Sequence, residues 1–191
     1  MNRPTVFAAV AIALACIATG AEDQATLQLA NTDVREVLAA YERLTAFKIV
    51  TDSGAIGMVK IRIAQPIPKA EAIAMIEQTL FANGYSLIQL DQDTIRVVGI
   101  GKNARNEGIP FVSKAEDIPA SERLISFVIK LQFRQPEELV PILLRHTAAS
   151  PALGNILVAD PTARAIIVTD RSSIVRNLIK LVKEIDVPKR K

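Results

Sequence analysis

Apolar positions in the first part of the chain, residues 25–99, follow two different periods. Some stretches have the composition or the strict alternation of strands, and others repeat apolar residues every three or four positions, as amphipathic helices do. Strands are predicted at 26–30, 47–52 and 58–64 and helices at 34–45 and 69–84, followed by a hairpin around residues 92–93. Pro66 and Pro68 are expected to end the third strand. The predicted order is β-α-β-β-α-β-β.

A second patterned region covers residues 124–188. An apolar strand precedes a helix that has Pro136 in its first turn and Pro141 in its interior, so this helix is expected to be kinked or short. Two strands and a final helix follow, with Asp170 or Ser172 as the expected cap. This β-α-β-β-α order is KH-like. The predicted fold class is α/β (α+β), with two small mixed-sheet modules.

The residues between the two patterned regions, 100–123, are rich in Gly, Pro, Asn, Lys and Glu and show no sustained period. They are predicted to form a linker, in which Phe111 and Val112 dock against one of the modules. The predicted division is therefore a leader at 1–21, a first domain at 25–99, the linker at 100–123, and a second domain at 124–188.

The leader has the layout of a secretory signal peptide. Arg3 precedes an apolar run that ends in small residues, and the run is short for a bilayer span. Cys16 is the only cysteine, so a mature chain without the leader has no disulfide. The expected destination is the periplasm. The alternative is a leader that is retained as an N-terminal anchor.

Composition adds two constraints. Half of the residues are apolar but only 4% are aromatic, so the cores must be built mainly from aliphatic side chains. The net charge of +3 comes from interspersed acidic and basic residues, which gives no large basic field for nucleic acid. A KH domain also needs a G-x-x-G loop between helices, and the second module has none. Nucleic acid is therefore not expected as a partner.

No group of residues has the pattern of a catalytic or metal site. His146 is the only histidine, and it has no Cys, Asp or Glu at metal-ligand spacing. Asp160 and Asp170 each follow an apolar strand, but without a base or metal beside them they are better explained by turns and caps. We therefore expect no enzymatic activity, no metal and no cofactor.

Two segments of the first region, "NTDVREVL" and "KIVTDSGAIGMVKIR", together with "LFANGYSLIQLDQDTIRVV", resemble the first N-terminal domain of bacterial secretins, the secretin and TonB short N-terminal domain. In the second region, "FVIKLQFRQPEELVPIL", "ILVADPTARAIIVTD" and "IVRNLIKLVKEIDVP" resemble the NolW-like secretin repeat. The similarity covers residues 25–188. Secretins continue into a pore-forming β-domain, so the sequence is expected to represent the docking end of a secretin without its pore.

The resemblance implies a role in protein interaction within a type II secretion or type IV pilus-like system. The implied partners are an inner-membrane component or a pore-forming secretin, and the second module is similar to one that builds homo-oligomeric rings. Association with the outer membrane would then pass through these partners. A short first strand at the edge of its sheet recruits partner strands readily. The predicted contact residues are Thr26, Leu27, Gln28, Leu29, Ala30, Lys60 and Arg62.

Two alternatives stay open at this point. The contact residues are equally consistent with ordinary positions of a sheet. The first domain type also occurs in TonB-linked receptors, which would make the chain a signalling or receptor accessory module.

Overall fold

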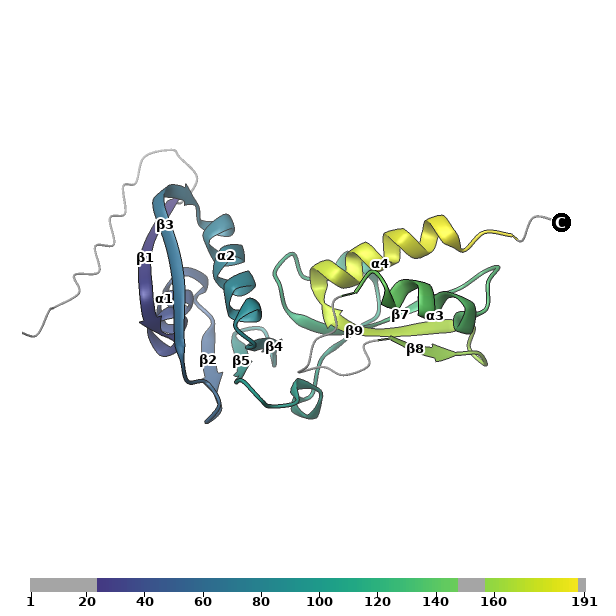
Figure 1. Ribbon diagram of the computed structural model, residues 1–191, viewed down its shortest axis with the longest axis horizontal. Coiled ribbons are helices and arrows are strands. Elements are labelled where there is room, and N and C mark those ends of the chain that lie inside the picture. Colours follow the sequence, from purple (N-terminus) through teal and green to yellow (C-terminus); the bar gives the residue numbers. More distant parts are fainter. Residues whose placement is uncertain (1–23, 148–156, 189–191) are drawn as a thin grey trace, which may run out of the picture.

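The computed structural model describes residues 24–147 and 157–188, so the predicted leader lies outside the described residues. The N-terminal region has the predicted order of elements (Figure 1), which confirms the fold class for this half. Its elements are β1 (Gln24–Asp33), α1 (Val34–Thr45), β2 (Lys48–Thr51), β3 (Met58–Pro68), α2 (Lys69–Ala82), β4 (Ser86–Gln89) and β5 (Thr94–Val98).

Two small sheets and two helices enclose the N-terminal core. β1 pairs with β3 in an antiparallel ladder, and the second sheet has the order β2-β5-β4, in which β2 runs parallel to β5. The core is largely aliphatic, as the composition predicts. Tyr41 and Tyr85 are its buried aromatic side chains, and Phe47 and Phe81 pack against it partly buried. Asp33 is the N-cap of α1, and its side chain accepts a hydrogen bond from the Arg35 N–H.

β3 does not end at Pro66, the first of the two prolines that the sequence had suggested as its end. The strand continues through Pro66 to Pro68, where Pro68 pairs with Gln24. Between the pairs Ala25–Ile67 and Leu27–Ile63, β3 has two more residues than β1, and Pro66 lies in this bulge. Proline has no backbone N–H to donate. It is tolerated in a bulge because the extra residues there do not take part in the hydrogen bonds of the ladder.

The segment between the two regions contains defined structure. Two short 3-10 helices, η1 (Ala104–Glu107) and η2 (Ala115–Asp117), lie on either side of β6 (Phe111–Val112). β6 pairs in parallel with β7 (Leu124–Lys130), so Phe111 and Val112 dock as a short strand at the edge of the second sheet. The segment therefore extends the C-terminal sheet.

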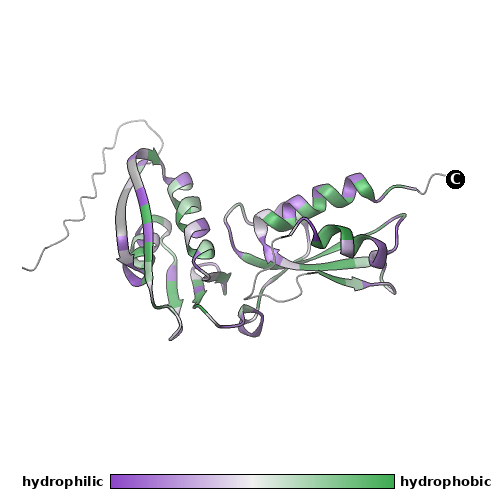
Figure 2. Ribbon diagram, in the orientation of Figure 1, coloured by the Kyte–Doolittle hydropathy of each residue, from purple (hydrophilic) through white to green (hydrophobic). Residues whose placement is uncertain are grey.

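The C-terminal region has the predicted β-α-β-β-α order. Its elements after β7 are α3 (Pro136–Leu144), β8 (Leu157–Asp160), β9 (Ala165–Arg171) and α4 (Ser172–Ile185), and the sheet order is β6-β7-β9-β8. Both helices bury apolar side chains in one core with alternate residues of the strands. Figure 2 shows apolar and polar residues in turn around α4, as expected for a helix with one face on a sheet.

Two local predictions for this region can be compared with the structure. α3 is short, with Pro136 in its first turn and Pro141 inside it, as expected. The predicted cap of α4 is wrong, because the N-cap is Arg171 and no side chain caps the helix. The Ser172 hydroxyl instead donates to the Arg123 carbonyl, since Ser172 faces the start of β7.

The end of α4 is fastened to the turn after β7 by one carboxylate. Asp186 accepts hydrogen bonds from the backbone N–H groups of Gln132, Phe133 and Arg134, at 2.6, 3.0 and 2.8 Å. Burial alone would raise the pKa of Asp186, but these three donors outweigh it and hold the pKa below its usual value. The carboxylate therefore links the end of α4 to the turn between β7 and α3.

A close backbone crossing closes the N-terminal region. The Asp52 carboxylate accepts from the N–H groups of Gly54 and Gly99, and the Ile100 N–H donates to the Gly54 carbonyl. A Cβ atom on Gly99 would lie 1.8 Å from the Gly54 carbonyl carbon. The two chain segments can approach this closely only because Gly99 has no side chain.

Candidate protein-interaction site

The predicted contact residues lie on the β1–β3 ladder, which brings together residues far apart in the sequence. Gln28 pairs with Arg62, and the neighbouring pairs are Leu27–Ile63 and Leu29–Ile61. Lys60 lies beside a second irregularity, where β1 has one more residue than β3 between the pairs Leu29–Ile61 and Thr32–Val59. The ladder thus pairs the predicted strand with the strand that carries the two predicted basic residues.

The two faces of β3 differ as its alternation predicts. Val59 and Ile61 are buried in the N-terminal core, whereas Lys60 and Arg62 are exposed. Thr26 on β1 is exposed as well. Within residues 24–147 and 157–188, β1 and β3 pair only with each other, so each strand has one edge without a partner strand. Such an edge offers backbone donors and acceptors to an added strand.

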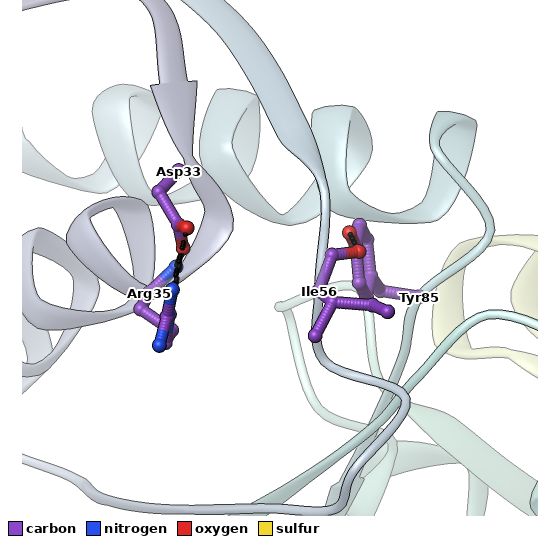
Figure 3. A network of polar contacts seen from close by, with 4 residues as sticks. All are labelled: Asp33, Arg35, Ile56 and Tyr85. Atoms are coloured by element: carbon purple, nitrogen blue, oxygen red, sulfur yellow. Dashed lines mark hydrogen bonds and ion pairs between the residues drawn. The ribbon is translucent and has the colours of Figure 1, made fainter.

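Polar contacts fix the end of the ladder at which β1 leads into α1 (Figure 3). The Arg35 side chain donates to both carboxylate oxygens of Asp33, at 3.0 and 2.8 Å. The hydrogen bonds from Arg35 hold the pKa of Asp33 at about 2. On the β3 side, the Tyr85 hydroxyl donates to the Ile56 carbonyl at 2.6 Å. The entry into β3 is therefore held by the side chain of Tyr85, a buried residue of the N-terminal core.

The turn before β3 has a conformation that favours glycine. Gly57 has a φ of +130°, and its carbonyl accepts from the Val34 N–H at 2.9 Å, which joins the turn to the first residue of α1. A Cβ at this position would lie 2.9 Å from the Tyr85 hydroxyl oxygen. The conformation of Gly57 therefore sets the positions of its two neighbours, Ile56 and Met58.

Ile56 and Met58 are the apolar residues of this end that sequence reasoning missed. They are 65% and 54% exposed, and Met58 pairs with Asp33 at the last position of the ladder. Exposed apolar groups next to charged ones are common where proteins meet. The available signal was an isoleucine between two glycines in a turn, where polar residues are more usual.

The described residues contain no group of three or more His, Cys, Asp or Glu side chains placed to hold a metal ion. His146 is exposed just after α3, Asp160 accepts from the Ala163 N–H in the turn after β8, and Asp170 is buried and accepts from the Arg171 N–H. Burial raises the pKa of Asp170. Across the same residues, none of the helices has both the length and the hydropathy needed to cross a bilayer.

Comparison with known proteins agrees with this architecture. Residues 27–97 match the family described as the GspD-like N0 domain, and residues 126–191 match the bacterial type II/III secretion system short domain. The two regions are therefore similar to N-terminal domains of secretins, and the chain is similar to proteins described as the secretins GspD and XcpQ.

Individual relatives show the extent of this similarity. The chain is 27% identical over 161 residues to Secretin GspD 2 of Escherichia coli O78:H11, and 24% identical over 161 residues to Secretin XcpQ of Pseudomonas aeruginosa; each match covers 84% of this chain and 23% of the relative. The chain thus spans about a quarter of the length of these relatives.

One solved structure shares the fold over most of the chain. It is the Klebsiella pneumoniae type II secretion system outer membrane complex of PulD, PulS and the PulC HR domain. The TM-score is 0.68 at 16% sequence identity, and the match covers 84% of this chain and 26% of that chain.

Proposed function

We propose that this chain is a non-enzymatic, periplasmic protein-interaction component of a type II secretion or type IV pilus-like system. The two matching families both describe secretion-system domains, which disfavours the TonB-linked alternative. In this proposal residues 25–99 form the docking domain, residues 100–123 the connection, and residues 124–188 the NolW-like ring-building domain. Residues 1–21 act as the export signal.

The observation that carries the docking role is the β1–β3 ladder with its unpaired strand edges, exposed Lys60 and Arg62, and exposed Met58. An added partner strand would gain backbone hydrogen bonds, and an acidic partner surface would complement the two basic side chains. The K. pneumoniae complex contains the PulC HR domain with the secretin PulD. We propose the equivalent periplasmic domain of an inner-membrane component as the partner of this ladder.

Binding of that domain is the direct test of the docking role. Titration calorimetry of the chain with the purified HR-type domain from the same secretion system should show binding that the double variant Lys60→Glu, Arg62→Glu weakens by about tenfold or more, because charge complementarity becomes repulsion. Lys180→Glu, an exposed charge reversal on α4, is the matched control and should bind as the wild type does. Absence of wild-type binding, or equal affinity in both variants, would contradict the proposal.

Ring assembly is the second part of the proposed function. The face of the C-terminal sheet that the helices leave uncovered exposes the cross-strand pair Val158 and Ile167, at 46% and 36%, and α3 exposes Ile142 and Leu144. Two unlike apolar patches on one domain suit head-to-tail contacts, which close into rings when the rotation permits.

We expect concentration-dependent oligomers in size-exclusion chromatography with light scattering. Ile167→Lys should shift the chain toward the monomer, because it places a charge in the apolar contact. Lys183→Ala, on the exposed side of α4, should leave the oligomer unchanged. A strictly monomeric wild type at the highest soluble concentration would rule out ring assembly by this chain alone.

A further inference from the structure

A buried carboxylate lies at the boundary between the N-terminal and C-terminal regions. Glu77, on α2, is fully buried. One of its oxygens accepts a hydrogen bond from the Tyr41 hydroxyl of α1 at 2.6 Å, and the other accepts from the backbone N–H of Glu122 at 2.5 Å. Tyr41 belongs to the N-terminal core, whereas Glu122 leads into β7. The carboxylate therefore bridges the two regions.

The other side of the Glu122–Arg123 dipeptide is held by the beginning of α4. The Arg123 carbonyl accepts from both the N–H and the hydroxyl of Ser172, at 2.8 and 3.0 Å. The Ser173 hydroxyl donates to the Glu122 carboxylate at 2.6 Å. With β7 following directly in the chain, the dipeptide is a fixed part of the C-terminal region. The hydrogen bond from the Glu122 N–H to Glu77 therefore connects α2 to the C-terminal region as a whole.

Arg123 extends the contact back into the N-terminal region. Its guanidinium lies 4.4 Å from the centroid of the Phe47 ring and donates to the Gln89 side-chain oxygen. Arg171 repeats this arrangement, with its guanidinium 5.4 Å from the Phe81 ring centroid. Cation–π contacts of this kind stabilise most when they are shielded from water, as they are at buried Arg123.

Apolar packing accompanies these polar contacts. Ile88 on β4 and Val98 on β5 are buried in the C-terminal core cluster, although both belong to the N-terminal sheet, and β4 contacts β7. Apolar packing alone is not directional, so it tolerates sliding of one region over the other. A buried carboxylate with two fixed donors is directional, because any shift leaves Tyr41 or Glu122 with an unsatisfied donor.

The charges around Glu77 come from both regions. Burial raises the pKa of Glu77. The hydrogen bonds from Tyr41 and the Glu122 N–H lower this pKa, as does the positive charge of Arg123, whereas the negative charge of Glu122 raises it. A buried ionisable group of this kind is weak evidence for stability, but it can specify one arrangement over others. An apolar residue would fill the same place on α2 without this specificity.

We propose that Glu77, together with Glu122 and Arg123, forms an orientation lock that holds the N-terminal and C-terminal regions in one fixed arrangement. The lock is independent of which partner binds the β1–β3 ladder. Its consequence is that a partner bound to the first domain is placed at a defined position relative to the second domain, without a flexible hinge between them.

Distance measurement between spin labels tests the lock in the full chain. Labels are attached at Glu36→Cys on α1 and Lys180→Cys on α4, both exposed sites, in a Cys16→Ser background. The wild type should give one narrow distance distribution. Glu77→Leu should widen it by about twofold or more, because regions without a specific contact move relative to each other by default. Glu77→Gln should keep it narrow, since an amide can accept from Glu122 and donate to the Tyr41 oxygen.

A second variant keeps the test decisive if Glu77→Leu fails to fold. Arg123→Met retains the apolar stem of the side chain but removes the guanidinium from Phe47 and Gln89, and it should also widen the distribution. Circular dichroism establishes that each labelled variant is folded. A distribution that stays as narrow as that of the wild type in the folded variants would overturn the proposal, and so would a broad distribution in the wild type.

Discussion

Replacing Gly99 with alanine is expected to destabilise the N-terminal region by about 3 kcal/mol or more, which places it among the severe single substitutions. The added Cβ would lie 1.8 Å from the carbonyl carbon and 2.1 Å from the carbonyl oxygen of Gly54. These are backbone atoms, so no rotamer change can relieve the overlap, and the two chain segments must separate. Separation would also break the hydrogen bonds from the Gly99 N–H to Asp52 and from the Ile100 N–H to Gly54.

Chemical denaturation measures this loss, and Gly101→Ala is its control. Gly101 lies two residues further on and has a φ of +78°, so alanine there is strained, but no atom lies within 4 Å of its Cβ position. We expect Gly101→Ala to cost about 1 kcal/mol, the conformational term alone. Similar losses in the two variants would show that the close crossing of Gly54 and Gly99 does not determine stability.

Replacing Glu77 with leucine is expected to lower the free energy of unfolding by about 2–4 kcal/mol, because the Tyr41 hydroxyl and the Glu122 N–H both lose their acceptor in a buried place. Glu77→Gln preserves an acceptor for Glu122 and should stay within about 1 kcal/mol of the wild type near neutral pH. Denaturation followed by circular dichroism separates the two variants. Equal stability of the leucine and glutamine variants would mean that the two donors find other partners.

The same pair of proteins, wild type and Glu77→Gln, gives a pH test. Burial raises the pKa of Glu77 above its ordinary value of 4.5, so the folded state binds the proton more tightly than the unfolded state. The contribution of Glu77 to stability is then fully present below pH 4.5 and is lost as the pH rises through the raised value. The difference in unfolding free energy, wild type minus Glu77→Gln, should therefore fall with rising pH. Asp170 is also buried with a raised pKa, but both proteins contain it, so its contribution cancels in the difference of unfolding free energy. A difference that grows with pH would contradict this assignment.

Some parts of the structure could not be read from the sequence, for reasons that particular residues show. Pro66 suggested a strand end, but the register between β1 and β3 places it in a bulge, and register depends on both strands together. Ser172 suggested a helix cap, but its hydroxyl donates a hydrogen bond to the Arg123 carbonyl instead. Glu77 lies four residues after Ile73 and three before Leu80, within an apolar stripe, which was the signal for a buried charge. Its partner Glu122 is 45 residues away, and no local pattern points to it.

The candidate site divides in the same way. Alternation along residues 58–64 correctly placed Lys60 and Arg62 on the exposed face of β3. The pairing of Arg62 with Gln28 became visible only in the β1–β3 ladder. The exposure of Ile56 and Met58, on either side of Gly57, became visible only in the folded turn. The contact role of these residues and the domain boundaries stay predictions for the binding and assembly experiments.

The sequence by itself determined the order of the elements, the aliphatic character of both cores and the similarity to secretin N-terminal domains. These properties depend on residues close together in the chain, where the period of apolar positions specifies a helix or a strand. The tertiary structure alone decided the register of the β1–β3 ladder, the need for glycine at position 99, and the bridging of the two regions by Glu77. Each of these depends on the approach of distant segments, and it is the space and the hydrogen-bond partners available there that determine which residue is required.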